Sequence, residues 1–134
     1  GQEHQHLQET INHHQLNDLI TIYPATQHLN EKLAQSRMTV VPSRNEGFGM
    51  VILEAMAQDN IVISFKDTLG PSQLIQHNKN GYLADYANAQ SLAKYIDLAI
   101  QKKEHSENMI EASHQTLESY SPDKIYNAFY SIFK

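Results

Sequence analysis

Short apolar runs recur along this chain, and longer stretches of mixed character separate them. Four of the runs predict strands, because they are short and rich in β-branched or aromatic residues; they cover residues 19–23, 38–41, 61–65 and 82–84. Proline follows the first two runs, at Pro24 and Pro42, and ends them. The runs do not alternate apolar with polar residues, a pattern typical of parallel strands that are buried on both faces.

The other stretches predict helices, which cover residues 3–15, 26–36, 50–57, 70–77, 89–103, 107–119 and 122–133. In the first helix we expect Leu7 and Ile11 on the inner face, with His14 beside them. Ser121 before Pro122 is a helix-start signal, because proline suits the first helical turn. Since predicted strands and helices alternate, the chain is expected to be an α/β domain with an open parallel sheet.

One predicted helix is unusually apolar, because from Met50 to Ala57 only Glu54 is polar. A helix that is apolar all round is expected to be buried all round. A lone carboxylate in such a helix costs several kcal/mol unless something satisfies it. We therefore expect Glu54 to have a specific partner, either within the protein or in a ligand.

Residues 23–26, 43–49 and 64–72 follow predicted strands, and ligands of open α/β sheets bind at the carboxyl ends of the strands. Gly47 and Gly49 would let the backbone approach a ligand closely, and the next helix would offer free N–H groups to an anion such as phosphate. Glu46 and Glu54 flank this point, and either carboxylate could accept hydrogen bonds from a ribose or hexose diol. A Gly-x-Gly turn alone is a weak signal, however, and Glu46 could equally be a helix-end charge.

Composition excludes several classes of protein. A length of 134 residues fits one domain, and a net charge of −5 argues against nucleic acid or a strongly anionic membrane surface as a partner. The sequence has no cysteine, no apolar run of about 18 residues and no secretory leader, so we expect a cytoplasmic location. His4 with His6, or Glu9 with His13 and His14, could be imagined as metal ligands, but neither set forms an H-E-x-x-H motif and solvated helix surface is expected instead.

A longer block of residues resembles a known family. The block reads Pro42-Ser43-x-x-Glu46-Gly47-Phe48-Gly49-Met50-x-x-x-Glu54-Ala55-Met56-Ala57. It resembles the E-x7-E signature of the retaining glycosyltransferases of family 4, which have the GT-B fold. Two later segments resemble that family in residues and spacing, namely Gly70-Pro71-Ser72-x-Leu74-Ile75 and Asn80-Gly81-Tyr82-Leu83. The blocks together are far more specific than any one of them.

The resemblance implies two Rossmann-like domains with the active site between them. Residues 1–134 would form a single three-layer domain with C-terminal helices, which is most of the donor-binding half of a GT-B fold. Glu46 would be the catalytic residue, against the hydroxyls of the donor hexose, and Glu54 would bind the nucleotide ribose. The other donor-binding residues that the resemblance implies are Ser43, Gly47, Phe48, Gly49, Met50, Val51 and, near the base, Tyr23 and Ala25.

The resemblance also implies hexosyl transfer with retention of configuration, in which a helix N-terminus and basic side chains stabilise the leaving diphosphate. Those basic side chains and the acceptor domain would precede Gly1. The sequence has no Asp-x-Asp, in agreement with transfer that needs no metal or other cofactor. Leu69 stands where related bacterial enzymes often have an aromatic residue, which leaves the donor sugar open.

We therefore expect a glycosyltransferase domain that binds UDP-glucose or UDP-N-acetylglucosamine, for transfer to a bacterial surface glycan, a teichoic acid or a glycoprotein. This chain alone is expected to be inactive, and the whole enzyme is expected in the cytoplasm or at the inner face of the membrane. The apolar last helix predicts self-association into a homo-oligomer, through residues Ile125, Tyr126, Phe129, Tyr130, Ile132 and Phe133.

Three alternatives belong to other classes. A non-catalytic GT-B-like partner subunit of a glycosyltransferase would not need both Glu46 and Glu54. A nucleotide-sugar epimerase would differ at the site residues. A receiver-like signalling module would need an acidic cluster at the strand ends, where Tyr23, Pro42 and Ser43 stand instead.

Overall fold

A computed structural model describes residues 3–45 and 47–132, without the side chains of residues 129 and 130. Its elements, in chain order, are α1 (His4–His13), α2 (Leu29–Ala34), β1 (Met38–Val41), α3 (Met50–Ala57), β2 (Ile61–Phe65), α4 (Leu69–Leu74), β3 (Gly81–Ala84), α5 (Ala89–Gln101), α6 (Lys103–Ser119) and α7 (Pro122–Ile132). All the predicted helices and three of the four predicted strands are therefore confirmed, although several ends differ. For example, α2 begins three residues later than predicted and α6 begins four residues earlier.

Strands β1, β2 and β3 form one parallel sheet in that order. Met38 pairs with Ile61 and Val62 pairs with Gly81, so each crossover moves the chain one strand along the sheet. Every residue of β2 is buried, as expected for a central strand between two helix layers. The predicted α/β class with a parallel sheet is confirmed.

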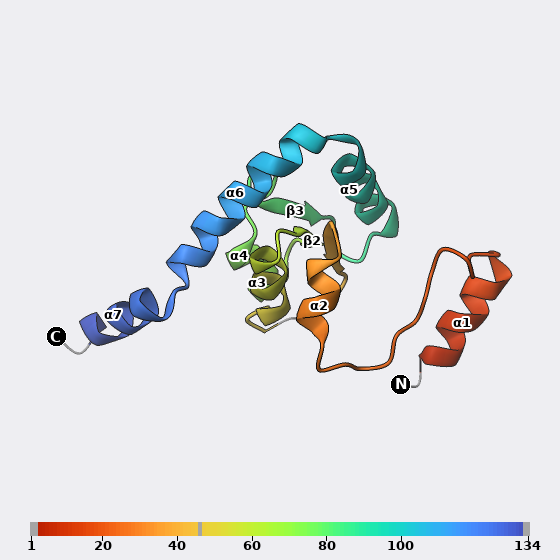
Figure 1. Cartoon of the computed structure of the whole chain (residues 1–134), viewed down its shortest axis with the longest axis horizontal. Coiled ribbons are helices and arrows are strands. Elements are labelled where there is room, and N and C mark those ends of the chain that lie inside the picture. Colours follow the sequence, from red (N-terminus) through yellow and green to blue (C-terminus); the bar gives the residue numbers. More distant parts are fainter. Residues whose placement is uncertain (1–2, 46, 133–134) are drawn as a thin grey trace.

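Helices cover both faces of the sheet and give the domain three layers (Figure 1). On one face, α2, α3 and α4 contribute to a first core cluster of Leu33, Val41, Ile52, Ala55, Met56, Val62, Leu74 and Ile75. On the other face, α5 and α6 contribute to a second core cluster of Ile61, Ile63, Tyr82, Ala99 and Met109. Helix α6 reaches both clusters, because Met109 belongs to the second and Leu117 packs against the first. The layers are Rossmann-like, as predicted.

The strand predicted at residues 19–23 is wrong, because residues 20–26 have no regular structure. Leu19 is 81% exposed, and Ile20 and Tyr23 are also exposed. A strand needs a neighbour that pairs with its N–H and C=O groups. In the described part of the chain β1 pairs only with β2, so no strand lies beside this segment. A β-branched composition does not make a strand where no partner lies alongside.

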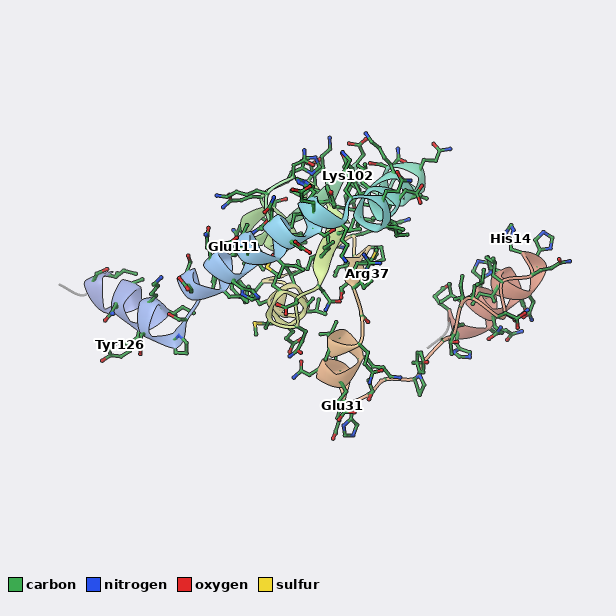
Figure 2. All side chains as sticks on the ribbon, turned by 45° about the horizontal axis from the view of Figure 1, so that its top comes forward. His14, Glu31, Arg37, Lys102, Glu111 and Tyr126 are labelled. Atoms are coloured by element: carbon green, nitrogen blue, oxygen red, sulfur yellow. The ribbon has the colours of Figure 1, made fainter. Side chains whose placement is uncertain are left out.

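Helices α1 and α7 lie at opposite ends of the molecule, clear of the sheet (Figures 1 and 2). In α1 only part of the predicted inner face is correct, because Ile11 is buried whereas Leu7 and His14 are exposed. On α7, Ile125 and Ile132 are exposed. Such an apolar face agrees with the predicted self-association, which stays a prediction. No helix within residues 3–45 and 47–132 is long and apolar enough to cross a membrane.

Candidate functional site

The carboxyl ends of β1 and β2 open into a cavity of about 360 Å³, called here the strand-end cavity. It is lined by Arg44, Asn45, Gly47, Asp67, Thr68 and Leu69. The first three come from the loop after β1 and the others from the loop after β2 and the start of α4. Two of the three segments predicted to hold a ligand, residues 43–49 and 64–72, are therefore brought together at one edge of the sheet.

The loop after β1 enters α3 through Gly49, which is the N-cap of the helix and has a φ of +84°. A side chain here would be strained, and its Cβ would lie 3.1 Å from Ile52 Cδ1. The Ile52 N–H donates to the Gly49 carbonyl, over 2.9 Å. The N–H groups of Met50 and Val51 belong to the first helical turn and have no acceptor among the described residues. They lie at the positive end of the helix dipole, which is a suitable place for an anion.

The other predicted residues of this loop differ in exposure. Phe48 and Met50 are exposed, whereas Ser43 and Val51 are half-buried. Glu46, the predicted catalytic residue, lies outside the described residues. Of the predicted residues, Gly47 lines the strand-end cavity, and Gly49, Met50 and Val51 lie at the start of α3. The role of Glu46 stays a prediction.

The prediction that α3 is buried all round is wrong. Its buried residues are Ile52, Ala55 and Met56, which form one stripe at the i, i+3, i+4 spacing, while both ends of the helix are exposed. Glu54 is half-buried, and its carboxylate has no hydrogen bond or ion pair with another described residue. Partial exposure removes much of the desolvation cost that would require a protein partner. The Glu54 carboxylate is therefore open to a ligand.

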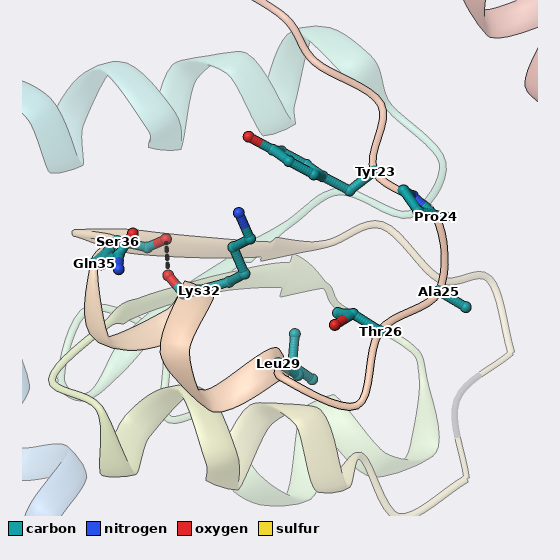
Figure 3. A pocket seen from close by; sticks show the side chains of 8 residues that line it. All are labelled: Tyr23, Pro24, Ala25, Thr26, Leu29, Lys32, Gln35 and Ser36. Carbon is teal, nitrogen blue, oxygen red and sulfur yellow. Dashed lines mark hydrogen bonds between the residues drawn. The ribbon is translucent and has the colours of Figure 1, made fainter.

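Tyr23 and Ala25 lie at a different cavity, of about 890 Å³, between the irregular segment and α2 (Figure 3). This cavity, called here the Tyr23 cavity, is lined by Tyr23, Pro24, Ala25, Thr26, Leu29, Lys32, Gln35 and Ser36. Lys32 Nζ lies 4.0 Å from the centroid of the Tyr23 ring, which is a cation–π contact. The two cavities share no lining residue, so the structure does not join the predicted base-binding residues to the strand-end cavity.

An ion pair ties two of the strand ends together. Lys66 follows β2 and Asp85 follows β3, and Lys66 Nζ lies 2.8 Å from Asp85 Oδ1. The hydrogen bond and the opposite charge lower the pKa of Asp85 and raise the pKa of Lys66. Arg44, by contrast, has no hydrogen bond or ion pair within the described residues, and it is the basic residue among those that line the strand-end cavity. Arg44 is therefore the better placed of the two cations to meet a ligand there.

Sequence reasoning missed part of each cavity. Asp67 and Thr68 lie in a segment that the strand-end rule indicates, but no motif singles them out. Lys32 carries no local signal, because its contact with Tyr23 depends on the path of an irregular segment. In the part of the chain that the structure describes, no group of three or more His, Asp or Glu side chains is placed to hold a metal ion.

A comparison with protein-family models decides the family. Residues 1–116 match the family described as "Glycosyl transferases group 1". The chain belongs to this family. The match includes every residue that lines either cavity, so both cavities are part of a glycosyl transferase group 1 domain.

Curated relatives are longer than this chain. An uncharacterized glycosyltransferase of Haemophilus influenzae is 29% identical over 125 residues, which cover 93% of this chain and 35% of that protein. The poly(ribitol-phosphate) alpha-N-acetylglucosaminyltransferase of Staphylococcus aureus is 31% identical over 102 residues, which cover 75% of this chain and 21% of that enzyme. The chain thus spans about a third or less of the length of these two relatives.

Solved structures show the same fold. A variant of S. aureus TarM, in complex with fondaparinux, alpha-GlcNAc-glycerol and UDP, matches with a TM-score of 0.86 at 25% identity, over 98% of this chain and 27% of that one. The pneumococcal O-GlcNAc transferase GtfA, in complex with UDP and GlcNAc, matches with a TM-score of 0.80 at 25% identity, over 97% of this chain and 27% of that one. The neighbours are GT-B glycosyltransferases, and the predicted Rossmann-like fold is confirmed.

Proposed function

We propose that this chain is the donor-binding part of a retaining glycosyltransferase that uses UDP-glucose or UDP-N-acetylglucosamine. The observation that carries the proposal is the Gly49 turn in a glycosyl transferase group 1 domain. It joins the carboxyl end of β1 to first-turn N–H groups of α3 that have no acceptor among the described residues. The UDP in the TarM and GtfA complexes supports a uridine diphosphate sugar as the donor.

Each part of the donor has a counterpart in this proposal. The diphosphate lies against the N–H groups of Met50 and Val51, where the helix dipole favours negative charge. Glu54 accepts hydrogen bonds from the ribose hydroxyls, since its carboxylate has no partner among the described residues. Glu46 holds the hydroxyls of the hexose, a role that rests on the resemblance to family 4 and its E-x7-E signature. The base lies towards Tyr23.

The remaining proposals concern the whole protein. Residues 1–134 form one domain, and an acceptor domain outside this sequence completes the active site, so this chain alone turns over no donor. The acceptor is a surface glycan, a teichoic acid or a glycoprotein, which the names of the S. aureus relative and of pneumococcal GtfA support. The enzyme works without metal, in the cytoplasm or at the inner face of the membrane.

Ligand-observed NMR with UDP, UDP-glucose and UDP-N-acetylglucosamine tests donor binding by this chain. We expect saturation-transfer signals from the ribose protons that weaken in Glu54→Gln. They should be unchanged in Glu111→Gln, which alters an exposed glutamate on α6. Equal ribose signals in Glu54→Gln and the unmodified chain would contradict the role of Glu54. Absence of signals with all three ligands would move the test to the full-length protein, which would include the basic side chains expected outside this chain. Absence of binding there as well would favour the non-catalytic partner subunit.

A further inference from the structure

We infer that two residues outside the ligand-binding loop, Gly70 and Tyr120, are positioning residues that fix the main chain of residues 47–49. These three residues are called here the glycine turn. Gly70 lies in α4 and Tyr120 follows the last residue of α6. Each meets the glycine turn from a different element, and neither lines the strand-end cavity.

Gly70 lies directly against the backbone of the glycine turn. A Cβ atom built on Gly70 would lie 2.4 Å from the carbonyl oxygen of Gly47 and 2.8 Å from the carbonyl carbon and oxygen of Phe48. These distances are shorter than any real Cβ contact, and the opposing atoms are backbone atoms that cannot rotate away as the end of a side chain can. Only glycine at position 70 lets α4 and the turn pack this closely.

Hydrogen bonds fix the start of α4 more firmly than they fix the glycine turn. Thr68, the N-cap residue of α4, is buried, and its hydroxyl donates to the Phe65 carbonyl at the end of β2, over 2.8 Å. The Ser72 N–H donates to the Thr68 carbonyl over 3.0 Å. In the glycine turn, by contrast, the N–H groups of Gly47 and Phe48 have no acceptor among the described residues. A side chain at position 70 would therefore displace the turn rather than the start of α4.

Tyr120 packs against the side chain of Phe48, the middle residue of the glycine turn. Phe48 is 45% exposed, and its ring meets the Tyr120 ring edge to face, with centroids 5.7 Å apart and planes at 66°. Tyr120 itself is fixed, because it packs against the first core cluster and its N–H donates to the Leu117 carbonyl over 3.0 Å. Aromatic pairs in this arrangement are favourable beyond the area that they bury.

Both contacts act on the three residues that precede Met50 and Val51. A displaced turn would move the first-turn N–H groups of α3, which the proposed function places against a diphosphate. A small misplacement of binding groups is costly for a ligand that needs several of them at once. Ligand affinity therefore depends on Gly70 and Tyr120 although neither lines the strand-end cavity. The statement about ligand affinity rests on the proposed function, whereas the positioning of the turn does not.

Two-dimensional amide NMR spectra of this chain test the inference with two variants, each with a matched control. Gly70→Ala is compared with Ser72→Ala, an exposed position on the same helix. Tyr120→Leu, which removes the ring, is compared with Tyr120→Phe, which keeps it. We expect the amide signals of residues 47–51 to move in Gly70→Ala and Tyr120→Leu, while those of β1, β2 and β3 stay in place. The two controls should match the unmodified chain.

A titration with UDP supplies the second measurement. We expect the dissociation constant to rise about tenfold or more in Gly70→Ala and Tyr120→Leu, and to stay unchanged in the two controls. If no form of the chain binds UDP while the signals of residues 47–51 still move, the positioning of the turn stands. The proposed function is then tested by UDP binding to the full-length protein, and it fails if that protein does not bind UDP either.

Three results would overturn the inference. One is a Gly70→Ala spectrum whose residues 47–51 match those of Ser72→Ala. Another is a change spread evenly over the sheet in both variants, which would indicate a general loss of structure. The third is an unchanged UDP affinity in a chain that binds UDP at residues 47–51, which would contradict the dependence of ligand affinity on Gly70 and Tyr120. If Gly70→Ala does not fold, the amide signals of residues 47–51 in Tyr120→Leu, compared with those in Tyr120→Phe, test whether the turn is positioned from outside the loop.

Discussion

The strand-end cavity and the Tyr23 cavity differ in how their walls are held. The walls of the first are loops that leave two paired strands, and one of them is further tied by the bond from Thr68 to the Phe65 carbonyl. The second lies between α2 and an irregular segment whose aromatic ring rests on Lys32. A residue next to a paired strand is therefore fixed by the core, whereas a residue in the irregular segment depends on local contacts alone.

The largest expected effect compares a core residue with an apolar residue of the irregular region. Ile52 is fully buried in the first core cluster, and Ile52→Ala should lower the free energy of unfolding by about 2–5 kcal/mol. Leu19 is mostly exposed, and Leu19→Ala should change the free energy of unfolding by less than about 0.5 kcal/mol. Urea unfolding followed by circular dichroism measures both. Similar losses in the two variants would mean that residues 14–28 contribute to the core.

A second comparison lies within the strand-end cavity itself. Gly49→Ala should cost about 1–2 kcal/mol of unfolding free energy, because the position has a positive φ that disfavours a side chain. Gly47→Ala should cost much less, since no described atom beyond its chain neighbours lies within 4 Å of the added Cβ. The same unfolding experiment checks the pair. An equal cost at both positions would contradict the described geometry of the turn into α3.

A third comparison tests the weaker wall of the Tyr23 cavity. The Tyr23 ring should shift the side-chain proton signals of Lys32 upfield, and Tyr23→Leu should abolish the shift while Tyr23→Phe keeps it. The loss of the cation–π contact should lower the free energy of unfolding by about 0.5–1 kcal/mol at most. Lys32 signals that are unaffected by Tyr23→Leu would show that the ring does not rest on Lys32 in solution.

The smallest effect concerns a histidine outside both cavities. Burial lowers the pKa of His77 below its usual 6.5, and the positive charges of Lys94 and Lys66 lower it further. The unfolded chain therefore takes up this proton more readily than the folded chain. Neutral His77 therefore makes its full contribution to the free energy of unfolding at pH values above 6.5, and this contribution falls as the pH drops below 6.5.

His77→Asn isolates this contribution. Nδ1 of His77 accepts a hydrogen bond from the Leu83 N–H over 2.9 Å, and an asparagine oxygen can replace that acceptor without titrating. Between about pH 7 and pH 5, the urea midpoint of the unmodified chain should fall more than that of His77→Asn. Parallel pH profiles would contradict the lowered pKa.

The same contrast explains which parts of the fold follow from the sequence. The strands at residues 38–41 and 61–65 were predicted with the observed ends, because a strand buried between helix layers reads as a continuous apolar run bounded by polar residues or proline. The run at residues 19–23 has the same local pattern and forms no strand, since pairing depends on a neighbour that no local pattern reveals.

The site residues also fall into those that the sequence predicts and those that it does not. The glycine turn and the segment at residues 64–72 were predicted from their place after strands, and the structure brings them together. Lys32 and Tyr120 were not predicted as site residues. The contact of Lys32 with Tyr23 depends on the path of the irregular segment, and Tyr120 meets the ring of Phe48, which lies far from it in the sequence. The half-exposure of Glu54 was also missed, since an apolar composition was read as burial on every side of α3.

Amide shift mapping with UDP, compared with uridine, tests most directly whether the start of α3 binds a nucleoside diphosphate. UDP should move the amide signals of residues 47–51 most strongly, whereas uridine, which has no diphosphate, should leave those of Met50 and Val51 in place. UDP binding that leaves residues 47–51 unchanged, or that uridine reproduces there, would contradict the assignment of this turn as the diphosphate site.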